Sequence, residues 1–528
     1  MLEQELINDD NSNTAEPSAE QEPSAEQEPS AEKEPLTAKN PATDAPKHSE
    51  LGYNPADADS IFTHLNDHFT LQRRSFDQHP YESLDERQTH LSNLKAMLMD
   101  NSEAIVAAIN ADYGNRSRQE SMLAEILVAV DDIISSRKKV KKWMKVQKRH
   151  VDMTMFFGAK NKVIPQPIGV IGLIIPWNFP INLSFMGLAA AFAAGNRAMV
   201  KMSENSRTLC KLLIELTPKY FTPEKLQFFD ETGMVGQQFS SVPFDHLMFT
   251  GSGATGRKVM ANAAKNLTPV TLELGGKSPA VLCPDYDLEK GVERIMFAKQ
   301  YNAGQICTNV DYLFVHESQL EHFILTATEW TKKHVPDIGS VDYTSIIDDV
   351  SFNRISATVE DAKAKGARVI NLNNQEPQSD LRKFPLTLIL DVTEEMTIAN
   401  RETFGPLLLV MPYQDKQEIV EYVQAKDRPL AFYPFTNDTR LADFYIENVM
   451  SGGVSINDAL FHVAQHDLPF GGIGPSGMGH YHGYEGFLTF SKLRPVFKQA
   501  SFSTIKFLAP PYGKLANNVL NTLVKLRK

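Results

Sequence analysis

The chain has 528 residues, enough at roughly 100 to 200 residues per domain for about three structural units, which excludes a single small module. Hydrophobic residues make up 42% and charged residues 22%, proportions that exclude wholesale disorder. The net charge is -12, but residues 1–50 carry 13 acidic and 3 basic side chains, so the nearly neutral remainder argues against nucleic-acid binding.

The chain begins with an acidic, low-complexity segment. Three hexads of the form EPSAE(Q/K) run from Glu16 to Lys33 with almost nothing apolar to bury, so residues 1–52 are predicted to be a disordered acidic tail. This start lacks the basic and apolar regions of a signal peptide. The sequence holds three cysteines, an odd number that makes no complete disulfide framework, so we expect a reducing, cytoplasmic location.

Helical spacing of apolar residues dominates from about residue 59 to residue 148, as in Ile61, Leu65 and Phe69. The segment from Ser83 to Glu86 has the pattern of a capping box, which predicts the start of a helix there. An alternating stretch at 151–163, broken at a glycine, predicts a hairpin.

Residues 163–196 contain no charged side chain, which is typical of a membrane span. Four prolines, at 165, 167, 176 and 180, would break a spanning helix, so we predict a buried strand at 170–175 and a buried helix at 181–194. Alternating strands and helices then predict a parallel sheet. The further elements expected are strands at 198–202, 227–229, 246–250 and 270–274 and helices starting at 206 and 254.

A second alternating block runs from residue 280 to about 457, with strands at 280–282 and 312–315 around a helix at 288–300, and predicts a second α/β lobe. From residue 492 onward there are eight basic and no acidic residues. The apolar positions between 515 and 524 share one helix face, which we expect to dock on the protein, with an anionic membrane surface as the alternative.

The segment from Gly251 to Gly256 reads GSGATG, follows a predicted strand and opens a predicted helix, and Glu273 comes about 20 residues later. This is the pattern of a dinucleotide-binding turn, in which Glu273 would hold a ribose. However, that turn normally follows the first strand of its fold, and here at least two strands precede it. A glycine-rich helix start is the alternative interpretation.

A carboxylate and a thiol, both reactive side chains, stand close to glycines in the sequence. Glu273 stands before Gly275 and Gly276, and Cys307 follows Gly304 in the segment YNAGQICTN. A cysteine thiol is a few per cent ionised at neutral pH, so a reactive one needs a stabiliser such as a helix N-terminus. Cys210 and Cys283 lie in apolar segments and are predicted to be small buried hydrophobes.

Six segments, in this order, resemble the aldehyde dehydrogenase family over roughly residues 55–500. They are PWNFP at 176–180, KMSE at 201–204, FTGS at 249–252, LELGGK at 272–277, GQIC at 304–307 and ETFGP at 402–406. The late segment LPFGGIGPSGMGHYHGYEGFLTFS is most similar to the dimeric class 3 branch, and within it to bacterial coniferyl aldehyde dehydrogenases.

The resemblance implies an α/β fold with a Rossmann-like parallel-sheet cofactor domain (53–150 and 164–279), an α/β catalytic domain (280–465) and a small β oligomerisation extension (151–163 and 490–500). Residues 501–528 would be a basic C-terminal tail. The extension would have an open strand edge, and such an edge pairs readily with a second subunit, so we expect a homodimer.

The resemblance also implies the chemistry. Cys307 would attack the aldehyde carbon, the side-chain amide of Asn178 and the backbone N–H of Cys307 would stabilise the oxyanion, and Glu273 would activate the water that releases the acid. As a ribose ligand, Glu273 would instead affect cofactor binding; we favour the general base. No metal site is predicted, because His462 and His466 have no suitably spaced acidic ligand.

For the cofactor, the resemblance implies NAD, with NADP as the alternative. Lys201 and Glu204 would bind the adenosine ribose, Ser252 would lie near the pyrophosphate, and Glu402 and Phe404 would lie at the nicotinamide end. A carboxylate at 204 would repel a 2′-phosphate, which favours NAD. Further cofactor-binding residues implied are Ile174, Pro176, Trp177, Gly233, Thr250, Gly251 and Leu274.

The implied substrate is an aromatic aldehyde such as coniferyl aldehyde, with medium- or long-chain aliphatic aldehydes as the alternative. Phe461, His462 and His466 are expected to line the substrate entrance. Two other function classes remain open: a catalytically silent nucleotide-binding protein on this scaffold, and a cofactor-independent thiol esterase. The retained Cys307, Glu273 and Asn178 argue against the first, and the cofactor motifs argue against the second. Glu273 also favours release of the acid to water over transfer to coenzyme A.

Overall fold

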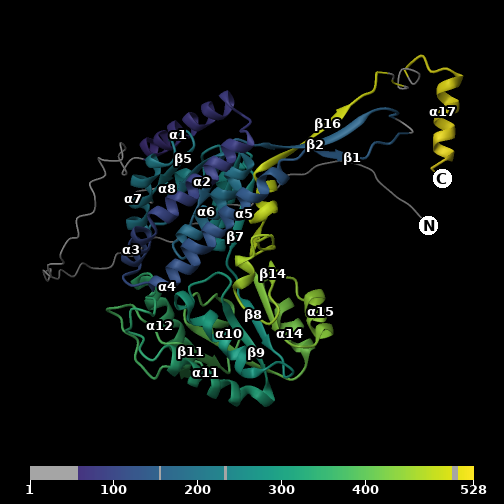
Figure 1. Ribbon diagram of the computed structural model, residues 1–528. Coiled ribbons are helices and arrows are strands. Elements are labelled where there is room, and N and C mark those ends of the chain that lie inside the picture. Colours follow the sequence, from purple (N-terminus) through teal and green to yellow (C-terminus); the bar gives the residue numbers. More distant parts are fainter. Residues whose placement is uncertain (1–57, 154–155, 231–234, 502, 504–508, 528) are drawn as a thin grey trace, which may run out of the picture. The chain divides into compact units, whose positions relative to one another are not determined.

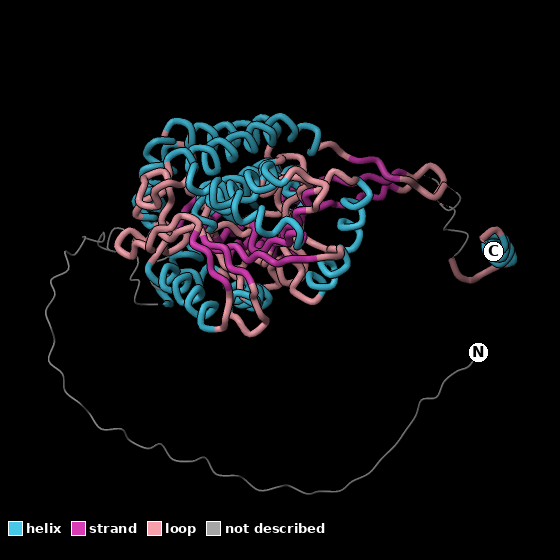
Figure 2. Tube along the Cα trace, turned by 90° about the horizontal axis from the view of Figure 1, so that it is seen from below, coloured by secondary structure: helices cyan, strands magenta, loops and turns pink. Residues whose placement is uncertain are grey.

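The structure, a computed structural model, describes residues 58–153, 156–230, 235–501, 503 and 509–527. The predicted acidic tail at 1–52 and Gly233 lie outside the described residues. Residues 51–528 form one unit. Strands run between helices throughout its folded body (Figure 2). The alternation of the two element types along the sequence is therefore an alternation in space as well.

The N-terminal block is helical, as the apolar spacing predicts. Ile61 and Leu65 are buried on the first helix. The capping box is confirmed, since the Ser83 hydroxyl accepts from the Glu86 N–H at 3.3 Å and the Glu86 carboxylate accepts from the Ser83 N–H at 2.7 Å. The helices are α1 (Ala58–Gln78), α2 (Leu84–Asp100), α3 (Ser102–Tyr113), α4 (Arg118–Ser121), a π-helix η2 (Met122–Leu127) and α5 (Val128–Trp143).

The uncharged stretch at 163–196 forms the centre of the first sheet. Strand β3 (Val170–Ile174) is buried throughout, and every residue of helix α6 (Pro180–Ala194) is buried against α2 and α5 (Figure 1). Burial on all sides explains why no charged residue is tolerated there. In the part of the chain that the structure describes, no helix combines the length and apolar character needed to cross a membrane.

The first sheet has the strand order β15-β7-β6-β3-β4-β5. All neighbours pair in parallel except β15, which pairs antiparallel with β7. The other strands are β4 (Arg197–Lys201), β5 (Leu226–Phe229), β6 (His246–Gly251), β7 (Val270–Leu274) and β15 (Gly477–Met478), and the connecting helices are α7 (Arg207–Leu216), η3 (Thr217–Lys219), α8 (Val235–Phe239) and α9 (Gly253–Ala264).

The second sheet has the order β10-β11-β12-β9-β8-β13-β14 and its own apolar core, built from residues 280–459. Only β10 pairs antiparallel among its described strands. The strands are β8 (Ser278–Leu282), β9 (Val310–His316), β10 (Arg368–Asn371), β11 (Thr387–Leu390), β12 (Leu407–Tyr413), β13 (Ala431–Phe435) and β14 (Gly453–Val454).

Helices accompany this second sheet between its strands. They are α10 (Leu288–Gln300), η4 (Tyr301–Gly304), η5 (Glu317–Gln319), α11 (Leu320–His334), α12 (Asp349–Ala364), α13 (Thr397–Asn400), α14 (Lys416–Gln424) and α15 (Thr439–Asn448). Helix α10 covers the residues that the sequence predicts. The later elements are η6 (Phe461–Ala464), α16 (Gly483–Thr489) and α17 (Lys514–Lys525).

A third sheet joins β1 (Gln147–Arg149), β2 (Lys160–Pro167) and β16 (Ser491–Lys498) in the order β1-β2-β16. The predicted hairpin at 151–163 is corrected, because its first strand precedes residue 151 and its second extends to 167. The polar triplet of β1 carries no alternating pattern, so sequence periodicity does not reveal it. Strand β16, from the second range predicted for the extension, pairs antiparallel with β2, from Ser491 against Pro167 to Lys498 against Lys160.

Helix α17 confirms that the apolar positions near the C-terminus are helical. Leu515, Val519, Leu520 and Val524 are exposed, and Ala516 is buried. Both predicted occupants of this face, the protein itself and an anionic membrane surface, stay predictions.

A short segment, Gly275–Gly276–Lys277, connects the two large sheets between β7 and β8. The Lys277 ammonium pairs with Asp311 on β9 and donates to the carbonyl oxygens of Ile398, at 2.9 Å, and Arg401, at 3.2 Å. Asp311 in turn accepts the Thr403 N–H at 2.7 Å. These bonds fix the segment around residue 402 beside the carboxyl end of β7, where the functional site lies.

Candidate active site

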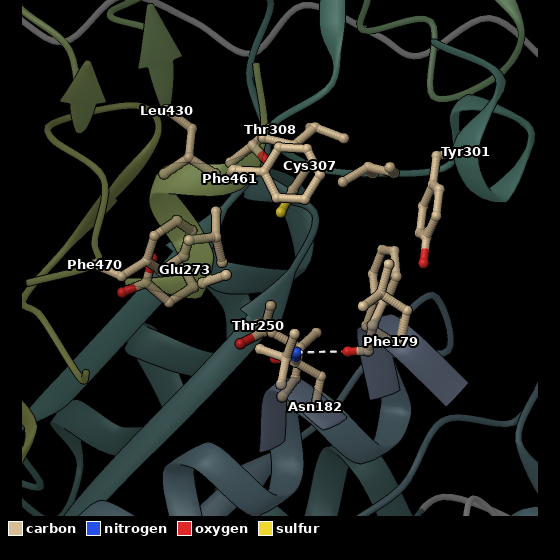
Figure 3. Close-up of a pocket in the computed structure, with 18 of the residues that line it drawn as sticks. Phe179, Asn182, Thr250, Glu273, Tyr301, Cys307, Thr308, Leu430, Phe461 and Phe470 are labelled. Carbon is tan, nitrogen blue, oxygen red and sulfur yellow. Dashed lines mark hydrogen bonds between the residues drawn. The ribbon is translucent and has the colours of Figure 1, made fainter. Parts of the chain in front are cut away.

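A cavity of about 300 Å³ brings Cys307 and Glu273 together. Its wall is almost entirely apolar and comes from the π-helix η2, helix α6, strand β7, the segment before β9 and the loop around η6. Figure 3 shows the Cys307 sulfur directed into this space, with Glu273, Thr250 and Phe461 around it. The aromatic residues of the wall are Phe179, Phe297, Tyr301, Phe461, Phe470 and Tyr481.

Cys307 is presented by a left-handed turn. Asn302, Ala303 and Gly304 have φ values of 50°, 48° and 75°. Left-handed backbone costs roughly 1 to 2 kcal/mol for a residue with a side chain, so other contacts must hold Ala303 there. Gly304 is required, because a Cβ at this position would lie 2.2 Å from the carbonyl oxygen of Gly405.

The surroundings of the Cys307 thiol disfavour its ionised form. Burial, together with the nearby Glu402 and Glu273 carboxylates, raises its pKa to about 12. The backbone N–H groups of Cys307 and Thr308 act in the opposite direction. Of these two donors, the Thr308 N–H is the one that the sequence analysis does not name.

Glu273 is the fourth residue of β7, between Thr250 on β6 and Gly477 on β15. Its side chain is 2% exposed. Burial raises the pKa of this carboxyl well above its usual value, and the backbone N–H of Gly472 offsets part of the shift. A carboxyl with a raised pKa beside a nucleophile is suited to accept a proton.

Asn178 is buried and is not among the residues that line the cavity. Its side-chain amide donates to the carbonyl oxygen of Gln305 at 3.2 Å, which leaves its second N–H for another acceptor. The backbone carbonyl of Asn178 accepts from the Asn302 amide at 3.4 Å and from the Tyr113 hydroxyl at 3.2 Å. Asn178 is therefore tied to the turn that precedes Cys307.

Several predicted cofactor residues lie at the carboxyl ends of neighbouring parallel strands. Ile174 pairs in register with Lys201 on β4 and with Phe249 on β6, and Gly251 pairs with Leu274. Helix α9 begins at the same edge with Ser252 as its N-cap, whose hydroxyl accepts from Thr255 N–H at 3.3 Å. Ligands of parallel α/β sheets bind at this edge. The buried Thr250 hydroxyl has no partner among the described residues.

The remaining predicted cofactor residues come from other segments. Trp177 packs edge-on against Phe404 at 5.5 Å between ring centroids. The Glu402 carboxylate lies close to the Gly275 backbone. A Cβ added at Gly275 would be only 2.2 Å from a carboxylate oxygen of Glu402. Burial and Asp311 raise the Glu402 pKa to about 8. Pro176 directly precedes Trp177 after β3, and Glu204 is exposed beyond the end of β4.

A family model for the aldehyde dehydrogenase family matches residues 30–496, most of the chain. The chain belongs to the aldehyde dehydrogenase family. It is an aldehyde-oxidising oxidoreductase. The family and the α/β fold predicted from the sequence motifs are thereby confirmed.

Among relatives of this aldehyde dehydrogenase, a probable coniferyl aldehyde dehydrogenase of Pseudomonas aeruginosa is 42% identical over 84% of this chain and 93% of that protein. A coniferyl aldehyde dehydrogenase of a Pseudomonas species is 41% identical over 90% of this chain and 99% of that protein. Among solved structures, the substrate-bound state of Staphylococcus aureus AldH matches with a TM-score of 0.82 and 29% identity, covering 87% of this chain and 99% of that chain.

The predicted substrate-entrance residues separate in the structure. Phe461 lines the cavity, but His462 and His466 do not. His462 is half-buried beside the ring of Tyr433, at 5.8 Å between centroids, and His466 lies 3.6 Å from the Asp132 carboxylate. The short helix η6 turns neighbouring residues in different directions, which the sequence does not show. Among the described residues, no group of three His, Cys, Asp or Glu side chains is arranged to hold a metal.

The other two cysteines are buried as predicted. Burial raises the pKa of Cys283 to about 12 and that of Cys210 well above its usual value. Sequence reasoning missed Tyr481, which lines the cavity with a buried hydroxyl that has no partner among the described residues. It also missed Glu120, which contacts the turn before Cys307. Glu120 has no periodic or motif signal, because only the fold brings it to the site. Tyr481 lies within the late segment LPFGGIGPSGMGHYHGYEGFLTFS, but the sequence assigns it no role there.

Proposed function

We propose that this aldehyde dehydrogenase uses NAD to oxidise a bulky apolar aldehyde, in the first place an aromatic one such as coniferyl aldehyde, to the carboxylic acid. The observation that carries the proposal is the meeting of Cys307 and Glu273 in one aromatic-lined cavity. The names of relatives at 41–42% identity support the aromatic substrate. An aliphatic aldehyde of medium or long chain is the second candidate, because the same wall accommodates an alkyl tail.

The residues supply the covalent steps. The Cys307 sulfur bonds to the carbonyl carbon, the thiol proton passes to solvent water, and the C=O π bond breaks so that the carbonyl oxygen becomes an oxyanion. The backbone N–H of Cys307 and the second N–H of the Asn178 amide donate to that oxyanion. A nicotinamide cofactor, held by the residues at the edge of the first sheet, would supply the acceptor for the hydride. Glu273 then takes a proton from a water, which attacks the Cys307 thioester; the carbon–sulfur bond breaks and the acid leaves.

The residues at the edge of the first sheet fit a nicotinamide dinucleotide. The N-terminus of helix α9 offers backbone N–H groups to a pyrophosphate, and the Thr250 hydroxyl at the same edge, which has no partner in the described part of the chain, is left for a ligand. The adenosine ribose would be bound by Lys201 and Glu204, the pyrophosphate would lie near Ser252, and the nicotinamide end would lie at Glu402 and Phe404. The remaining wall of this binding site is formed by Ile174, Pro176, Trp177, Gly251 and Leu274. Gly233 lies outside the described residues and stays a predicted contact.

The test is aldehyde oxidation with NAD, with NADP and without cofactor, over coniferyl aldehyde, cinnamyl aldehydes and saturated aldehydes of two to twelve carbons. We expect cofactor-dependent formation of the acid and the highest kcat/KM for the conjugated aromatic aldehydes. Hydrolysis of thioesters or esters without any aldehyde oxidation would favour the esterase. Highest kcat/KM for acetaldehyde would contradict both substrate classes.

The exposed carboxylate of Glu204 is expected to make NAD the preferred cofactor. Replacing it, as Glu204→Gln, removes the repulsion of a 2′-phosphate and should tighten NADP binding by about tenfold while changing NAD binding little. Fluorescence titration of the free enzyme with each cofactor measures both constants. Glu224→Gln, which changes a carboxylate not implicated at the cofactor edge, is the control. Unchanged NADP affinity in Glu204→Gln would remove Glu204 from the cofactor site.

We also infer a homodimer that forms through the open edge of β16. Leu493 and Phe497 on this strand are 39% and 51% exposed, and Pro495 is the kind of residue tolerated on an edge strand. Sedimentation at micromolar concentration is expected to give twice the chain mass of 59.0 kDa. A Leu493→Asp/Phe497→Asp variant should shift toward the monomer mass. A monomeric wild type would contradict the inference.

A further inference from the structure

The turn that presents Cys307 has to be held against its own backbone preference. Three successive left-handed residues, Asn302, Ala303 and Gly304, stand between helix α10 and the nucleophile. Of these three residues, Ala303 has a side chain that cannot make a hydrogen bond to offset the cost of the left-handed conformation. If the turn relaxed, the Cys307 sulfur and the Cys307 N–H would move together relative to Glu273. The contacts that hold the turn therefore control the geometry of the reaction.

Glu120 on helix α4 makes the most direct of these contacts from outside the turn. Its carboxylate oxygen Oε2 accepts the backbone N–H of Asn302 at 3.1 Å. Its backbone carbonyl accepts the Tyr301 hydroxyl at 3.0 Å. The Thr344 hydroxyl donates to the same Oε2 at 2.6 Å and accepts the Ser117 N–H at 3.2 Å, which fixes the carboxyl group.

The turn passes this constraint to the oxyanion donors. The Asn302 side-chain amide donates to the Gln305 carbonyl at 3.1 Å and to the Asn178 carbonyl at 3.4 Å. The Gln305 carbonyl also accepts from the Asn178 side chain, at 3.2 Å. One buried carboxyl group thus constrains, through Asn302, the segment before Cys307 and the position of Asn178.

Burying a carboxyl group costs folding free energy unless hydrogen bonds compensate for the lost hydration. Glu120 is 6% exposed. Burial raises its pKa to about 7, although the bonds from Thr344 and Asn302 and the nearby Arg116 offset part of the shift. Its part in the contacts above is that of a hydrogen-bond acceptor, which a neutral group of the same shape can also perform. Because the contacts need an acceptor and not a negative charge, Glu120→Gln is the conservative variant for the experiment.

We propose that Glu120 is a positioning residue for the aldehyde dehydrogenase reaction, holding the 302–304 turn so that the Cys307 sulfur, the Cys307 N–H and the Asn178 amide converge on one carbonyl group. The proposal rests on the proposed roles of Cys307 and Asn178. It adds a residue from helix α4, which lies 187 positions before the nucleophile in the sequence.

The experiment compares Glu120→Ala and Glu120→Gln with wild type. Misplacement of a reacting group by about 1 Å can cost about a hundredfold in rate, so Glu120→Ala should lower kcat by about tenfold to a hundredfold. KM for the aldehyde and cofactor affinity should stay within about twofold of wild type, because the cavity wall and the sheet edge are unchanged. Glu120→Gln should recover most of kcat, since its amide oxygen still accepts the Asn302 N–H.

A second readout does not depend on aldehyde turnover. The rate at which iodoacetamide alkylates Cys307, followed by mass spectrometry of the Cys307 peptide, should fall in Glu120→Ala and recover in Glu120→Gln. Thr344→Val, which removes the hydroxyl that fixes the carboxyl group, should show the same pattern with a smaller loss. If wild type does not oxidise aldehydes, the proposed function fails while this readout still tests the turn.

A matched control separates positioning from general destabilisation. Glu82 is also buried, at 3% exposure, and pairs with Lys225 at 2.7 Å in the helical block. Glu82→Gln should lower thermal stability and leave kcat per folded active site and the alkylation rate unchanged. Equal kcat losses in Glu82→Gln and Glu120→Ala, no recovery in Glu120→Gln, or an effect of Glu120→Ala confined to KM would each overturn the proposal.

Discussion

Replacing Cys307 by alanine is expected to lower kcat/KM for aldehyde oxidation by at least about four orders of magnitude. The sulfur is the atom that turns the carbonyl carbon tetrahedral, and without it no hydride is available to leave. Among the groups that line the cavity, no other side chain is a comparable nucleophile: Glu273 is held with a raised pKa and Thr250 is a hydroxyl without a base of its own. Cys307→Ser should lose nearly as much, because an unactivated hydroxyl is a weak nucleophile.

The measurement is cofactor reduction under saturating aldehyde, with the acid quantified directly. Cys210→Ala and Cys283→Ala are the matched controls, since both cysteines are buried in apolar cores and should change stability more than rate. Cofactor affinity should be retained in all variants. A Cys307→Ala enzyme that keeps more than about one per cent of the wild-type rate would show that another group begins the reaction.

The fold could be predicted largely from burial patterns. The charge-free segment from residue 163 to residue 196 specifies β3 and α6, because an element buried on every side has no position for a charge. The alternating elements that follow specify parallel pairing. Strand β1 was missed because it is three polar residues long, and its partner contacts rather than its own pattern make it a strand.

The site could be predicted only in part. Cys307 and Glu273 stand in segments whose glycines mark close backbone approach, and family motifs single them out. Glu120 carries no such mark, because its role depends on contacts between residues far apart in the chain. Tyr481 lies in the late glycine-rich segment, but only the fold shows that it lines the cavity. His462 and His466 do not line the cavity with Phe461, because proximity in sequence does not fix where a side chain points, and their place at the substrate entrance stays a prediction.

Glu273→Gln is expected to lower steady-state kcat by about a hundredfold to ten-thousandfold, the usual contribution of a general base. The glutamine keeps the volume of the side chain but accepts no proton, so hydride transfer can occur once and the thioester on Cys307 then persists. Rapid mixing with excess aldehyde and NAD should give one equivalent of reduced cofactor per active site, followed by a nearly flat phase. Intact-protein mass spectrometry of the quenched reaction should show the acyl group on Cys307.

The pH dependence of the same step gives an independent check. Burial raises the pKa of Glu273, so the carboxyl is protonated and inactive as a base at low pH. In wild type the deacylation rate should therefore rise as the pH passes upward through this raised pKa, and Glu273→Gln should lose that rise. If Glu273 were instead a ribose ligand, the variant would show a raised cofactor KM with normal turnover and no burst. Because the carboxylate lies in the cavity of Cys307, we expect the burst.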